Sequence, residues 1–81
     1  MPLNKAIKDK IVEVVENFIQ DELVLEHIQI DDIIDDLNFI LDSCLIKAPV
    51  YVECIKQLER LYDEEIIDSD DRDYAISQLS S

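Results

Sequence analysis

The sequence predicts an all-α fold, a small antiparallel bundle of three long helices followed by a short C-terminal helix. Apolar residues recur at three- and four-residue steps along most of the chain, which is the spacing of one face of an α-helix. The 81 residues include no glycine and only two prolines, so tight β-hairpins and barrels are disfavoured. At this length we expect a single domain spanning residues 1–81, in which short connections favour antiparallel neighbours.

The first helix is predicted over residues 4–26, with Asn4 as its N-terminal cap. The segment from Val24 to Ile30 alternates well enough for a short strand, but it has no plausible partner strand. We therefore interpret it as the end of this helix and a connection. The predicted apolar face consists of Ile7, Ile11, Val14, Val15 and Phe18.

The second helix is predicted over residues 32–47, capped by Asp31 or Asp32. Lys47 lies where a cation interacts favourably with the helix dipole, and Pro49 prevents the helix from continuing. The residues expected to point inward are Ile33, Leu37, Ile40, Leu41, Cys44 and Leu45.

The third helix is predicted over residues 49–67, because proline suits a first helical position. The side opposite its apolar face is expected to carry the polar residues Glu53, Lys56, Gln57, Glu59, Arg60 and Asp63. Its apolar face is formed by Tyr51, Cys54, Ile55, Leu58, Leu61 and Tyr62. A short helix over residues 70–79, capped by Ser69 or Asp70, completes a helical hairpin.

The formal net charge of −13 bounds the choice of partner. Such a chain is repelled by nucleic acid and by anionic membranes, and is attracted to basic protein surfaces. No apolar run approaches the length of a membrane span, and no signal or transit peptide is recognisable. The competing interpretation is that the charge only keeps the protein soluble.

Two groups of carboxylates are candidates for partner binding. The first array lies on the second predicted helix and comprises Asp31, Asp32, Asp35, Asp36 and Asp42. The second array lies around the predicted hairpin turn and comprises Asp63, Glu64, Glu65, Asp68, Asp70, Asp71 and Asp73. Carboxylates along a rigid helix can imitate the phosphates of a duplex, which carries one charge per roughly 1.7 Å.

Four apolar doublets exceed what one narrow helical stripe can bury. They are Ile33–Ile34, Ile40–Leu41, Leu45–Ile46 and Ile66–Ile67. We expect that a small bundle cannot turn both members of every doublet inward. The surplus predicts either a homodimer or an apolar groove for a partner.

The sequence offers no convergent set of groups for catalysis, so we do not expect an enzyme. His27 is the only histidine, and Cys44 and Cys54 do not have zinc-site spacing. Asp68, Asp70 and Asp73 do not fit the pattern of a calcium loop. No cofactor or metal is expected, and both cysteines are predicted to be buried free thiols in a reducing cytoplasm.

The stretch VECIKQLERLYDEEIIDSD resembles the second helix of acyl carrier proteins. In that family, a serine in an Asp-Ser-Leu motif at the start of this helix carries phosphopantetheine. Ala48, followed by Pro49, occupies the matching position here. Ser43, in the triplet Leu41-Asp42-Ser43, is the candidate attachment residue that the resemblance leaves.

The stretch LERLYDEEIIDSDDRDYAISQL resembles the short C-terminal helical-hairpin domain (SHOCT) of bacterial proteins. The shared features are spaced leucines, an isoleucine pair, a capped acidic turn and a final apolar turn. Glu65 stands in place of the usual glycine, and Arg72 stands where an aromatic residue is expected. The resemblance implies a helical hairpin and no chemistry.

The sequence therefore predicts a small acidic helical interaction protein that binds a basic surface of a nucleic-acid-binding or defence protein. One form of this function is a nucleic-acid-mimicking inhibitor of phage or mobile-element type. The alternatives are an acyl-carrier-like protein that uses Ser43 and a helical assembly subunit that uses the apolar doublets. The salt dependence of binding distinguishes the electrostatic inhibitor from the assembly subunit, because electrostatic binding weakens with ionic strength and apolar binding does not.

Overall fold

The computed structural model describes residues 4–20 and 25–79. They form four helices, α1 (Lys5–Ile19), α2 (His27–Asp42), α3 (Ala48–Asp63) and α4 (Ser69–Gln78), with no strand in this part of the chain. The all-α prediction is confirmed.

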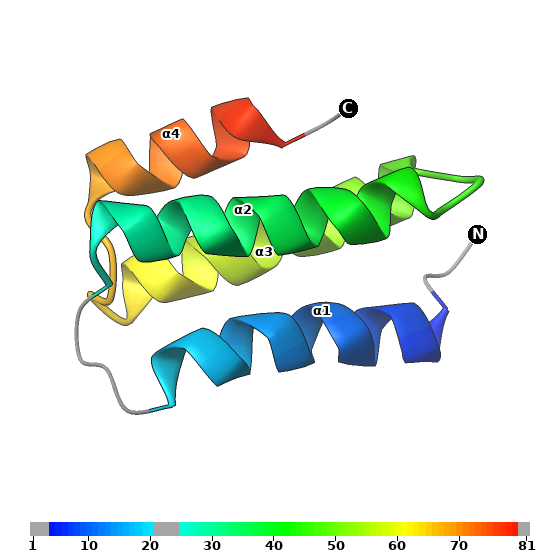
Figure 1. Cartoon of the computed structure of the whole chain (residues 1–81), viewed down its shortest axis with the longest axis horizontal. Coiled ribbons are helices and arrows are strands. Elements are labelled where there is room, and N and C mark those ends of the chain that lie inside the picture. The colour runs from blue at the N-terminus through cyan, green and yellow to red at the C-terminus, as the bar shows by residue number, and fades with distance from the viewer. Residues whose placement is uncertain (1–3, 21–24, 80–81) are drawn as a thin grey trace.

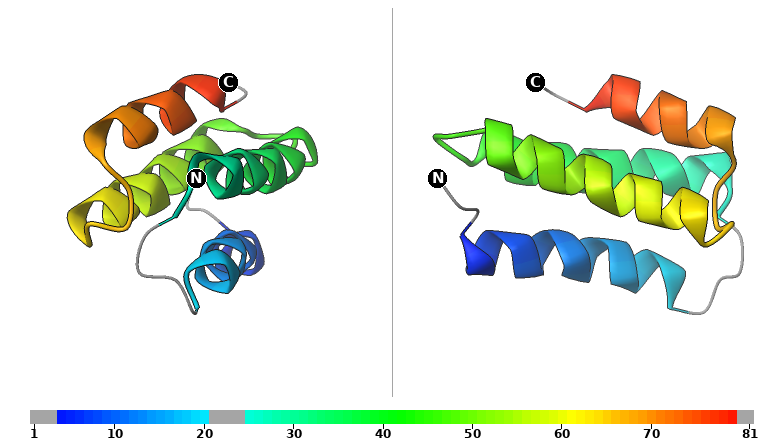
Figure 2. Two further views of the ribbon diagram at one scale, coloured as in Figure 1. Left: turned by 60° about the vertical axis from the view of Figure 1, so that its left-hand side comes forward. Right: turned by 180° about the vertical axis from the view of Figure 1, so that it is seen from behind.

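The helices α2 and α3 lie between the other two (Figure 1). Each of α1 and α4 packs against both of them, whereas α1 and α4 do not contact each other. Two further views show α1 and α4 on opposite sides of this central pair (Figure 2). The starts of α2 and α4 and the end of α3 lie together at one end of the molecule, which we call the turn end. The α2–α3 loop and the start of α1 lie at the other end, which we call the loop end.

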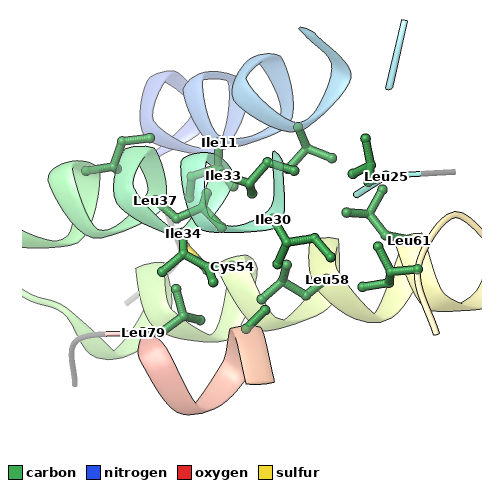
Figure 3. Close-up of a cluster of buried hydrophobic side chains, with 14 of the residues drawn as sticks. Ile11, Leu25, Ile30, Ile33, Ile34, Leu37, Cys54, Leu58, Leu61 and Leu79 are labelled. Atoms are coloured by element: carbon green, nitrogen blue, oxygen red, sulfur yellow. The ribbon is translucent and has the colours of Figure 1, made fainter. Parts of the chain in front are cut away.

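One apolar cluster joins all four helices (Figure 3). Ile33 points toward Ile11 on α1, and its neighbour Ile34 lies near Leu79, which follows α4. The helix α2 is therefore covered on two sides, and both members of a doublet can be buried. Three of the four doublets, at 33–34, 40–41 and 66–67, are buried in full, so the surplus of apolar residues is smaller than the sequence suggested. The doublet Leu45–Ile46 in the α2–α3 loop remains exposed.

The boundary between the first two helices differs from the prediction. The first helix is described to Ile19, and residues 21–24 of the helix predicted to residue 26 lie outside the described residues; the second helix begins at His27 instead of residue 32. Glu26 is the N-cap of α2, and its N–H donates to the Gln29 side-chain oxygen at 2.8 Å in a capping box. The buried Leu25 also donates a backbone hydrogen bond to the carbonyl of Ile66 at 3.1 Å. These bonds fix the entry to α2, so Asp31 and Asp32 are not caps.

The other boundaries also shift. Asn4 caps α1 as predicted, accepting from the N–H of Ala6 at 2.8 Å. The helix α2 ends at Asp42 instead of residue 47, and the Lys47 ammonium donates to the Leu41 carbonyl at 2.8 Å. Asp68, and not Ser69 or Asp70, caps α4 by accepting from the N–H of Asp71 at 2.8 Å.

The sequence suggested that the polar side of α3 faces solvent, but part of this side is buried. Glu53 and Gln57 are only 7% and 8% exposed, and the Gln57 amide donates to the Glu53 carboxylate at 2.9 Å. Arg60 donates to the Gln57 side-chain oxygen at 3.3 Å and pairs with Glu16 of α1 at 2.7 Å. Because α1 packs on this side of α3, amphipathic spacing alone could not identify these buried polar residues.

The third helix ends at Asp63 instead of residue 67, in a Schellman motif. The N–H of Ile66 donates to the Leu61 carbonyl at 2.9 Å, and that of Glu65 donates to the Tyr62 carbonyl at 3.0 Å. Glu65 has a φ of 62°, in the left-handed region where a side chain other than glycine is strained.

Replacing Glu65 with glycine should therefore raise the free energy of unfolding by about 1 kcal/mol. The expected rise in melting temperature is about 4–8 °C for a domain of this size. Calorimetry or thermal circular dichroism measures it. Asp63→Gly is the matched control, because that position is helical and glycine there should be destabilising by about 0.5–1 kcal/mol. A loss of stability in both variants would contradict the strain at Glu65.

Candidate binding surface

The turn end gathers carboxylates from the last turn of α3, the first turns of α4 and the segment between them. Every member of the second array lies here (Figure 1). Six of the seven are exposed, and Asp71 is half-buried. The spacing of charged residues in the sequence identified this group correctly as a cluster.

Part of the first array adjoins this cluster through His27. The two His27 ring nitrogens lie 3.7 Å from carboxylate oxygens of Asp31 on α2 and Asp71 on α4. The Tyr74 hydroxyl donates to Asp31 at 2.6 Å, and this hydrogen bond raises the pKa of Tyr74. The rings of His27 and Tyr74 are 4.7 Å apart. The start of α2 is thus joined to the start of α4 through polar contacts.

The rest of the first array does not form one row. Asp32 and Asp35 are exposed, and Asp36 lines a groove between α2 and α1. Asp42 lies at the loop end, where its carboxylate is 3.8 Å from the Lys47 ammonium. The five carboxylates of this array are spread over three parts of the surface, because α2 runs the length of the molecule.

A hollow of about 520 Å³ opens between the α3–α4 turn and Leu25. Leu25, Ile66 and Ile67 supply buried apolar side chains to its lining. Its carboxylates are those of Asp63, Glu65, Asp68 and Asp71. Lysine and arginine side chains combine an apolar stem with a charged head, so a hollow with apolar and carboxylate lining suits them.

The arginines near the turn end are engaged with the chain's own side chains. Arg60 pairs with Glu16 and Glu64, each at 2.7 Å, and these hydrogen bonds raise the pKa of Arg60. Arg72 lies 4.3 Å from the centre of the Tyr62 ring and 3.1 Å from Asp73. Within the second array, the carboxylates with no ion-pair partner among the described residues are Asp63, Glu65, Asp68 and Asp70.

His27 and Arg60 are the residues at this end that sequence reasoning missed. The four-residue spacing of His27 and Asp31 is a signal for their proximity. No local pattern pairs His27 with Asp71 or Arg60 with Glu16, because each pair joins two helices that are distant in sequence. These contacts depend on how the helices pack.

The thiols and Ser43 lie away from the turn end. Cys54 is fully buried, and burial, followed by the nearby charges of Glu53 and Cys44, raises its pKa to about 12. Cys44 is half-buried, and its thiol donates to the Ile40 carbonyl at 3.2 Å. Ser43 is exposed at the C-terminal cap of α2, where its hydroxyl donates to the Phe39 carbonyl at 2.9 Å. Within residues 4–20 and 25–79, no group of three or more metal-ligating side chains is arranged to hold a metal ion.

No protein-family model, curated protein or solved structure matches this chain. Among the helices described, none combines the length and apolar character needed to cross a membrane.

Proposed function

We propose that this chain is a cytoplasmic interaction protein whose turn end binds a basic surface of a nucleic-acid-binding or defence protein. The observation that carries the proposal is the group of four carboxylates of the second array that have no ion-pair partner among the described residues, three of which line the hollow at the α3–α4 turn. A lysine or arginine of the partner would place its stem on Ile66 and Ile67 and its charge among the carboxylates.

The charge of the whole chain supports the same direction. The formal net charge of −13 attracts basic surfaces over a long range and so speeds the encounter with them. The same charge repels nucleic acid. The partner's nucleic-acid site is then the natural target, because that site is built to receive negative charge. Occupying it makes the chain an inhibitor. In this proposal the helices form the antiparallel bundle that the sequence predicts, and this bundle holds the carboxylates in place.

The test compares two double charge reversals that change the net charge equally. Asp63→Lys with Glu65→Lys alters the hollow at the turn end. Asp9→Lys with Asp42→Lys alters exposed carboxylates elsewhere. Lysine is tolerated near helix C-termini, so neither change at the ends of α2 and α3 should unfold the chain.

The immobilised wild-type chain should capture a protein from the heparin-retained fraction of its host cells. The first double variant should lose that protein and the second should keep it. The captured protein should also lose its affinity for duplex DNA when the chain is added. Equal capture by both double variants, or unchanged DNA binding by the captured protein, would refute the proposal.

A further inference from the structure

The starts of α2 and α4 are joined by a network of four side chains, two from each helix. His27 and Asp31 belong to α2, and Asp71 and Tyr74 belong to α4. One oxygen of the Asp31 carboxylate accepts from the Tyr74 hydroxyl at 2.6 Å, and the other lies 3.7 Å from Nε2 of His27. Nδ1 of His27 lies 3.7 Å from an oxygen of Asp71. The imidazole ring is therefore placed between carboxylates of two helices that are distant in sequence.

The chemistry of imidazole makes this placement sensitive to protons. A neutral ring has one N–H donor, and its other nitrogen carries a lone pair. Because each nitrogen of His27 lies near a carboxylate, a neutral ring brings its lone pair close to a negative charge, whichever nitrogen holds the proton. The protonated ring has a donor on both nitrogens and is attracted to both carboxylates. This geometry suits the protonated ring and not the neutral one.

We infer that protonation of His27 fastens the start of α4 to the start of α2. Loss of the proton leaves Asp31 and Asp71 beside a ring that cannot donate to both, so the junction between the two helices weakens. Polar contacts matter for α4, because Ala75 alone is buried among its ten residues, all of which the structure describes. The inference concerns contacts within one chain, so it does not depend on partner binding at the turn end.

His27 is the side chain of this junction that changes its charge near neutral pH. Histidine is the residue type whose charge changes between about pH 5 and 8, and the sequence contains one histidine. The hydrogen bond to Asp31, followed by burial and by the charges of Asp31 and Asp35, raises the pKa of Tyr74. The Tyr74 hydroxyl therefore stays protonated in this range. Among the described residues, no charged side chain of α1 or α3 forms an ion pair with His27.

Urea denaturation at about pH 5.5 and 8 tests the inference. Relative to that of His27→Gln, the unfolding equilibrium constant of the wild-type chain should be about threefold smaller at the lower pH than at the higher. The stabilisation is complete while His27 is protonated in the folded and unfolded chains, and it is lost as the pH rises. The effect is modest, because the His27 side chain is 59% exposed and the dipole at the start of α2 disfavours a cation.

Two matched variants of α4 make the test specific to this contact. Asp71→Asn should reduce the pH-dependent difference, because it removes the carboxylate near Nδ1 of His27. Asp70→Asn removes the same charge from the same turn of α4. It should leave the difference unchanged, because Asp70 forms no ion pair with another described residue. In a double-mutant cycle, the coupling between His27 and Asp71 should stabilise the chain at about pH 5.5 and disappear at about pH 8.

Three results would overturn the inference. The first is the same pH dependence of stability in the wild-type chain and in His27→Gln. The second is an equal effect of Asp71→Asn and Asp70→Asn on that pH dependence. The third is a coupling between His27 and Asp71 that has the same size at both pH values.

Discussion

Replacing Leu37 with alanine should lower the free energy of unfolding by about 3–4 kcal/mol, measured by urea denaturation. Leu37 is 0% exposed and lies near Ile33 and Ile34 in the core (Figure 3), on a helix that contacts both α1 and α4. The substitution removes buried methyl groups and leaves a cavity that helices packed on both sides cannot easily fill. A chain of 81 residues has a total stability of about 4–12 kcal/mol, so the loss is a large part of it.

Ile28→Ala, on the same helix, is the matched control. Ile28 is 67% exposed, and its loss should change the free energy of unfolding by no more than about 0.5 kcal/mol. The slope of the free energy of unfolding against urea concentration should be similar in both variants if the unfolded chains are alike. Similar losses from Leu37→Ala and Ile28→Ala would show that α2 is not packed as described.

Stability should also fall steeply in alkaline solution because of Cys54. Its pKa is raised from 9.0 to about 12 in the folded chain. Below pH 9 the thiol is protonated in both states, so its full contribution to stability is present. Between pH 9 and 12 the unfolded chain releases this proton while the folded chain retains it. The free energy of unfolding should therefore fall by about 1.4 kcal/mol per pH unit in that range.

The measurement is urea denaturation at several pH values from 8 to about 11, which lies inside the range where the two states differ in protonation. Tyr74 also has a raised pKa, through its hydrogen bond to Asp31, so the comparison is made in a Tyr74→Phe background. Cys54→Val keeps an apolar side chain of similar size and should remove most of the alkaline slope. An unchanged slope in that variant would contradict the assignment to Cys54.

Periodicity and local capping explain what could be predicted from the sequence. The helix-forming regions, the Asn4 cap and the burial of Leu37, Leu41 and Leu58 all depend on residues close in sequence. The helix ends were less predictable. Glu26 is an unusual cap residue, and Glu65 adopts a backbone conformation that usually requires glycine.

Packing between distant segments explains the rest. Glu53 and Gln57 are polar yet buried, because α1 covers the side of α3 that carries them. The doublets Ile33–Ile34 and Ile40–Leu41 fit inside, because α2 has neighbours on two sides. For the candidate site, the second array could be identified from the sequence, since its members lie close together in sequence around one turn. The separation of Asp36 and Asp42 from that array depends on where α2 runs in the fold.

The dissociation constant of the complex with the captured basic protein, measured against salt concentration, tests partner binding at the turn end most directly. Binding through carboxylates predicts that the dissociation constant rises at least about tenfold between 0.05 and 0.5 M salt. The slope should be smaller for the chain that carries lysine at both Asp63 and Glu65. A dissociation constant that does not change with salt would contradict electrostatic recognition by this surface.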